Sequence, residues 1–112
     1  MFSNERRQEV ERDIVRATVE AALKLGFTLH SVNNGEEEPL VSTVDEVMEY
    51  AFSCDEAHIF FREPGMPVYS WLYIVLGNEG WTVISDYTVD LDGAVQATEA
   101  LVEKYEAEDA GA

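Results

Sequence analysis

The chain has 112 residues, of which 46% are hydrophobic, so it can form one domain with an apolar core but not two. Its 7 Lys and Arg residues stand against 23 Asp and Glu residues, which gives a formal net charge of −16 at pH 7. A field of this sign repels nucleic acid and anionic membranes, so the expected functions exclude direct binding to either.

The acidic charge is concentrated in one part of the chain. Residues 1–25 contain five bases and five acids and are neutral, whereas Arg62 and Lys104 are the only bases after them, against 18 acids. Such a surface attracts basic surfaces, including those that normally hold DNA or RNA. We therefore expect the partner to be a basic protein.

The single cysteine, Cys54, excludes an internal disulfide framework and is typical of a reducing compartment. Residues 1–7 lack the apolar run of a signal peptide, and no run approaches the roughly 20 apolar residues of a membrane span. We expect a cytoplasmic protein.

Periodicity predicts three helices and four or five strands. Apolar residues at helical spacing mark the helices; the second begins with the capping-box pair Thr43 and Glu46, and the third follows Asp90 as its N-cap. Pro39 confines the strand around it to a sheet edge. In chain order the expected elements are a helix over about 4–25, a strand over 27–32, a tight turn over 33–35, a short return strand at 40–41, a helix over about 43–53, strands over 57–62, 68–76 and 81–88 joined by a loop over 63–67 and a turn over 78–80, and a helix over about 91–105.

Three consecutive strands with short connections favour an antiparallel meander. The order of elements predicts an α+β fold, in which an antiparallel sheet combines this meander with an N-terminal strand or hairpin and carries helices mainly on one face. We expect a single domain over 1–105 and a disordered acidic tail over 106–112.

The strand over 68–76 has two unlike faces, because alternate side chains point to opposite sides. The aliphatic face, with Leu72 and Ile74, suits the helical layer. The other face is either a second core face or an interface with the first helix, a second copy of the chain or a different protein. It consists of Val75 and the three aromatic residues that are the candidate interface, Tyr69, Trp71 and Tyr73.

The acids most suggestive of a binding surface form three groups, in one loop and on two helices. Like charges at i, i+4 spacing cost a few tenths of a kcal/mol each, and few bases lie between them to relieve the repulsion. A helix face of this kind can imitate a row of phosphates. The candidate partner-binding residues are Glu36, Glu37, Glu38, Asp45, Glu46, Glu49, Glu99, Glu103 and Glu106.

The sequence predicts neither catalysis nor a metal or cofactor site. His30 and His58 fall in predicted strands with no second His or Cys at a ligand spacing, and Cys54 lies among acids, which disfavours nucleophilic catalysis. The aspartates within 86–92 lack the glycine and terminal glutamate of a calcium loop, so helix capping accounts for them better.

Residues 81–88, WTVISDYT, follow the segment LYIVLGN at 72–78 and precede an acidic helix. This arrangement resembles small acidic proteins of phages, prophages and plasmids that carry a similar "GN…ISDYT" run, and the resemblance extends over about 41–105. It implies a mobile-element setting inside a bacterial cell and no site residues. Small acidic proteins from such elements are often similar in character to anti-restriction or anti-CRISPR inhibitors, some of which mimic nucleic acid.

Three hypotheses follow. The first is a non-enzymatic inhibitor that competes with nucleic acid for a basic groove on a host nuclease or surveillance complex. The alternative is a homodimeric structural or adaptor protein that uses the aromatic face at Tyr69, Trp71 and Tyr73. A small enzyme or small-molecule binder, with Asp86 or His58 in a pocket lined by that face, ranks last.

Overall fold

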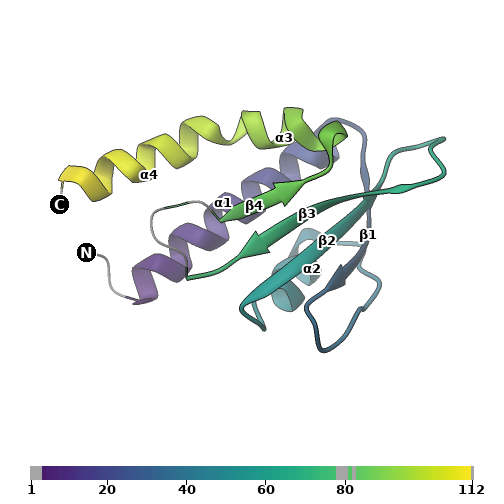
Figure 1. Cartoon of the computed structure of the whole chain (residues 1–112), viewed down its shortest axis with the longest axis horizontal. Coiled ribbons are helices and arrows are strands. Elements are labelled where there is room, and N and C mark those ends of the chain that lie inside the picture. The colour runs from purple at the N-terminus through teal and green to yellow at the C-terminus, as the bar shows by residue number, and fades with distance from the viewer. Residues whose placement is uncertain (1–3, 78–80, 82, 112) are drawn as a thin grey trace.

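A computed structural model describes residues 4–77, 81 and 83–111 and shows the α+β fold that the sequence predicts. Four strands form one antiparallel sheet in the order β1-β2-β3-β4. Helices α1 and α2 lie behind the sheet in Figure 1, and α3 and α4 run beside α1 near the β4 edge. The elements are α1 (Asn4–Lys24), β1 (Thr28–Asn33), α2 (Val44–Ala51), β2 (Glu56–Arg62), β3 (Tyr69–Val75), β4 (Ile84–Tyr87), a 3₁₀ turn (Val89–Leu91), α3 (Asp92–Ala97) and α4 (Glu99–Gly111).

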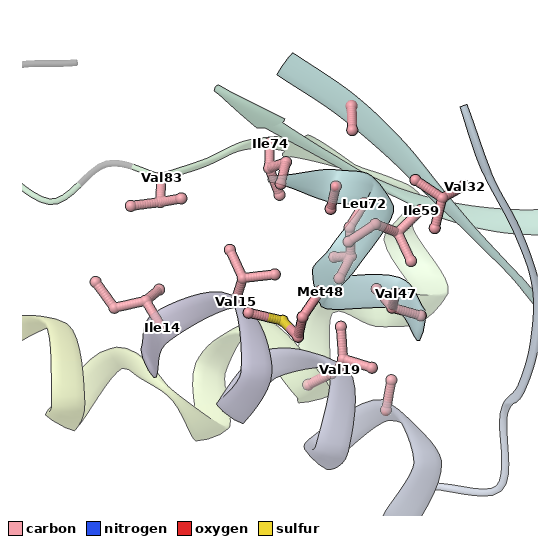
Figure 2. Close-up of a cluster of buried hydrophobic side chains, with 14 of the residues drawn as sticks. Ile14, Val15, Val19, Val32, Val47, Met48, Ile59, Leu72, Ile74 and Val83 are labelled. Carbon is pink, nitrogen blue, oxygen red and sulfur yellow. The ribbon is translucent and has the colours of Figure 1, made fainter. Parts of the chain in front are cut away.

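The apolar core fills the space between the sheet and the two helices behind it. Figure 2 shows side chains of α1 and α2 facing side chains of the strands. Fully burying one such aliphatic side chain contributes about 1.5–3 kcal/mol to folding. The core includes Ile14, Val15, Val19, Val47, Met48, Val32, Ile59, Leu72, Ile74 and Val83, all of which are buried.

The central pair of strands confirms the predicted alternation. Ile59 pairs with Leu72 and Ala57 pairs with Ile74, so the aliphatic face of β3 meets the helical layer. Ser70 is the polar member of that face, and its buried hydroxyl donates a hydrogen bond to the carboxylate of Asp90. The helices therefore cover one face of the sheet, as predicted.

The capping box of α2 is also confirmed. The Thr43 hydroxyl accepts a hydrogen bond from the Glu46 amide at 3.2 Å, and the Glu46 carboxylate accepts one from the Thr43 amide at 3.2 Å. The helix ends at Ala51, slightly earlier than expected.

The predicted return strand is only partly formed, as one bridge flanked by hydrogen bonds from Val32 to Pro39 and from Val41 to His30. Leu40 makes only an isolated bridge with Ser31, because Pro39 has no amide hydrogen to continue a ladder. The last strand begins at Ile84 rather than at Trp81, which lies in a turn and is buried. The predicted turn over 78–80 lies outside the described residues.

The predicted final helix is divided into three segments. Thr98 separates α3 from α4, because its hydroxyl donates to the Val95 carbonyl at 2.9 Å and meets the Thr18 hydroxyl of α1 at 3.1 Å. Asp90 is not a helix N-cap, since it lies inside the 3₁₀ turn and bonds Ser70. Where the sequence predicts a disordered tail from Glu106, α4 runs on to Gly111.

Candidate functional site

The nine candidate acids do not form one patch. The groups in the β1–α2 loop and on α2 lie at the β1 and β2 side of the molecule, whereas the row on α4 lies beyond the β4 edge (Figure 1). Helix α1 lies between α2 and α4 and packs against both. A flat partner surface therefore meets either the α4 row or the α2 side.

Two of the three acids on α2 already have partners within the chain. Asp45 pairs with Arg16 of α1 at 2.9 Å. Hydrogen bonds from Ser42 and Thr43 to the Glu46 carboxylate lower its pKa, because they favour its charged form. Glu46 thus caps α2, and Asp45 forms an exposed ion pair with α1, so both acids already interact within the chain.

The loop acids Glu36, Glu37 and Glu38 are exposed on a backbone that Asn34 holds. The Asn34 side-chain oxygen accepts hydrogen bonds from the amides of Glu36 and Glu37 at 3.0 and 2.9 Å. Its amide nitrogen donates to the Tyr50 carbonyl of α2 at 3.1 Å. Asn34 thereby ties the acidic loop to the end of α2, a role that its place in a predicted turn did not reveal.

The α4 row is the most regular acidic feature. Glu99, Glu103 and Glu106 follow one another at i, i+4 and i+7, are all exposed, and line one cleft of about 290 Å³. The rest of its lining comes from α1, the turn before β4, β4, α3, Thr98 and Val102 of α4. Sequence reasoning found the three glutamates but not the cleft, because its walls come from distant parts of the chain.

Tyr105 fixes α4 against α1. The tyrosine is buried, and its hydroxyl donates to the Asp13 carboxylate at 2.6 Å. This hydrogen bond, with burial, raises the pKa of Tyr105 to about 12. An ionised Tyr105 could not donate the bond, and its negative oxygen would be repelled by the Asp13 carboxylate. The ring meets Trp81 edge to face at 6.4 Å, and Arg6 pairs with Glu108 at 3.1 Å. The acidic row therefore sits on an anchored helix.

The other sheet face is aromatic, and no helix of the described chain covers it (Figure 1). Its central residues are only partly buried, and Tyr69 remains 45% exposed. The His58 ring stacks on Tyr73 at 4.5 Å and meets Trp71 edge-on at 5.5 Å. The His30 ring lies 4.3 Å from that of Tyr69. We call His30, His58, Phe60, Tyr69, Trp71 and Tyr73 the open aromatic face.

A further cleft, of about 360 Å³, lies between the first half of α1 and the residues after α2. Arg12, Cys54 and Asp55 are among its lining residues, as is Glu11, whose buried carboxylate accepts a hydrogen bond from the Gly77 amide at 2.8 Å. The mixture of bases and acids gives this cleft no net preference for one ligand charge.

Among the described residues, no group of three or more His, Cys, Asp and Glu side chains is arranged to hold a metal ion. The aspartates considered for calcium have separate partners: Asp90 accepts from Ser70, and Asp92 accepts from the Tyr87 hydroxyl at 3.0 Å. Neither Asp86 nor His58 lines the clefts at α4 or at α1 and α2. In the described chain, no helix combines the length and apolarity needed to cross a bilayer.

Comparisons with known proteins found no matching family model, no matching curated protein and no matching solved structure.

Proposed function

We propose that this protein is a non-enzymatic inhibitor from a mobile genetic element, which occupies a basic nucleic-acid-binding surface of a host defence complex. The observation that carries the proposal is the exposed row Glu99, Glu103 and Glu106 on the anchored helix α4. The target would be a nuclease or surveillance complex of the anti-restriction or anti-CRISPR kind, and inhibition would be competitive with its nucleic acid.

The geometry of the row supports this proposal. Its steps of three and four residues place successive carboxylates about 5–6 Å apart at their Cβ atoms, similar in scale to phosphates along a nucleic-acid strand. The net charge of −16 adds long-range attraction for a basic groove. Asp45 and Glu46 already have partners within the chain, and a flat partner surface on α4 does not reach the loop acids (Figure 1), so we assign the contact to α4 alone.

The test is capture from bacterial lysate at low salt, followed by stepwise salt elution and identification by mass spectrometry. We expect a nucleic-acid-binding protein to elute at intermediate salt and to be displaced by added DNA or RNA. The variant Glu99→Gln/Glu103→Gln/Glu106→Gln should lose most of this capture. The matched control Glu36→Gln/Glu37→Gln/Glu38→Gln removes the same charge elsewhere and should retain it.

Two outcomes would contradict the proposal. Binding that stays constant from low to high salt would show that charge does not drive the contact. Equal losses in the two triple variants would show that total charge, rather than the α4 row, attracts the partner.

The open aromatic face favours a second candidate, a homodimeric structural or adaptor protein. Tyr69, Trp71 and Tyr73 lie together on a sheet face that no described helix covers. Aromatic residues of this kind are enriched among the energetically important residues of interfaces. Sedimentation of the purified protein tests this candidate: a dimer that Trp71→Ala dissociates supports it, and a monomer over a wide concentration range rejects it.

A further inference from the structure

The cleft beside the acidic row has an apolar interior. Ile14 comes from α1, Trp81 from the turn before β4, Ile84 from β4, and Val95 and Val102 from α3 and α4. Its volume of about 290 Å³ is at the lower limit of clefts that take small-molecule ligands, about 300–1,000 Å³. A space of this size and lining suits one or two bulky apolar side chains better than a cofactor.

The rim of the same cleft is negative. Glu99, Glu103 and Glu106 line it and are exposed. Lys104, the base of α4, does not line the cleft, and its ammonium lies 5.7 Å from the centroid of the Tyr105 ring. The Arg7 guanidinium lies 4.8 Å from the centroid of the Trp81 ring and does not line the cleft either. The complementary surface is therefore an apolar side chain flanked by cations.

We infer that this cleft binds a basic amphipathic helix of the partner, with an apolar side chain in the cleft and Lys or Arg residues paired with the rim. The inference rests on the proposed function, which supplies the basic character of the partner. Glu99 to Glu106 extend over about 10 Å of helix at 1.5 Å per residue. A helix lying along α4 presents cations at the same i, i+4 and i+7 positions, which is the helix-in-groove mode of recognition.

A second copy of this chain fits the cleft poorly. Helix α1 contains five of the seven bases, but five acids lie among them, and its apolar side is buried in the core. Two copies would also bring together surfaces that each belong to a chain of charge −16. The charge complementarity therefore favours a different protein over self-association.

The experiment uses a synthetic helix-forming peptide of about 14 residues, or four turns, as the probe. Its sequence places leucines on one face and lysines beside them at i, i+4 and i+7. We expect saturable one-to-one binding to the full chain by calorimetry at low salt. Glu99→Gln/Glu103→Gln/Glu106→Gln should weaken the affinity about tenfold or more, through three lost charge pairs.

Three controls make the test specific. Glu36→Gln/Glu37→Gln/Glu38→Gln removes the same charge outside the cleft. When both triple variants are compared at about 0.15 M salt, where the Debye length is about 8 Å, it should change the affinity by about twofold or less. A peptide with serine in place of leucine should not bind measurably. In a Trp71→Phe background, Trp81 is the remaining tryptophan, and its fluorescence should change on binding.

Each contrary result overturns the inference. Equal weakening by both triple variants would leave only general charge attraction, and undiminished binding of the serine peptide would remove the role of the cleft. Equal binding of a proline-containing peptide of the same charge would exclude helix recognition. If these peptide tests fail while α4-dependent capture of a basic protein persists, the proposed function survives. If the peptide binds but no captured protein competes with nucleic acid, the proposed function fails and the inference stands.

Discussion

Aromatic residues occur in two regions of this protein, and the two regions use them differently. Near α4, Tyr105 is buried, bonds Asp13 through its hydroxyl and packs against the buried Trp81. On the open aromatic face, Tyr69 is exposed and Trp71 is only partly buried, and both contact their neighbours on the sheet. The first set fixes an acidic helix, whereas the second leaves apolar area exposed. The extent of burial, rather than the residue type, therefore decides whether an aromatic residue anchors an element or leaves a surface available to a partner.

The largest expected difference comes from truncating a tyrosine in each region. Tyr105→Ala should lower the free energy of unfolding by about 3–4 kcal/mol, because it opens a cavity between α4 and α1. Tyr69→Ala should cost less than about 1 kcal/mol, because the side chain is 45% exposed. Urea denaturation measures both. Similar costs would contradict the contrast between anchor and exposed surface.

A smaller effect isolates the hydroxyl of the same anchor. Tyr105→Phe keeps the ring but removes the hydrogen bond to Asp13, which should cost about 1.5 kcal/mol at neutral pH. The pKa of Tyr105 is raised from 10 to about 12 in the folded protein, so its contribution is complete below pH 10 and declines as the pH rises towards 12.

Unfolding free energies measured between pH 8 and 12 test this dependence. The unsubstituted chain should lose stability across the upper part of that range, relative to Tyr105→Phe. Parallel curves for the two proteins would show that the hydrogen bond to Asp13 does not hold the helix.

The cap of α2 extends the comparison to a charged residue with a structural role. Thr43→Ala removes the hydroxyl that caps α2 and should cost about 1 kcal/mol. Glu46→Gln should also destabilise the protein, because the charged carboxylate accepts hydrogen bonds from Ser42 and Thr43. Glu46 has its pKa lowered on folding, so its contribution is lost as the pH falls through that depressed pKa. Urea titrations of the two variants at pH 7 and at acidic pH check these expectations, and unchanged midpoints would contradict them.

Local patterns predicted local structure well. The apolar spacing of α1, the Thr43–Glu46 capping box and the alternation along β3 each depend on neighbours in the chain, and each was confirmed. The break at Thr98 was missed, because it depends on a hydroxyl contact with Thr18, 80 residues away in the chain. The apolar stripe from Leu91 to Tyr105 is equally compatible with one continuous helix.

Only the acidic residues of the candidate site could be predicted from the sequence, and not the cleft that they line. The sequence identified the glutamates of α4, but Ile14 and Ile84 reach the same cleft only after α1 and β4 have packed around it. The sequence also could not show which acids have partners within the chain. The ion pair of Asp45 can be recognised only once the position of Arg16 on α1 is known, because the two residues lie 29 positions apart in the chain.

The smallest expected effect concerns the row on α4. Glu103 has like-charged neighbours at Glu99 and Glu106, so Glu103→Gln should raise the free energy of unfolding by a few tenths of a kcal/mol at low salt. The gain should diminish as salt screens the repulsion. Thermal unfolding of Glu103→Gln at low and high salt measures this gain in stability. Glu49→Gln on α2 serves as the comparison variant. A stabilised variant that binds the basic peptide probe less well would support a binding role for the repulsion along α4. A destabilised variant would instead place Glu103 with Glu46, among the acids that hold the structure together.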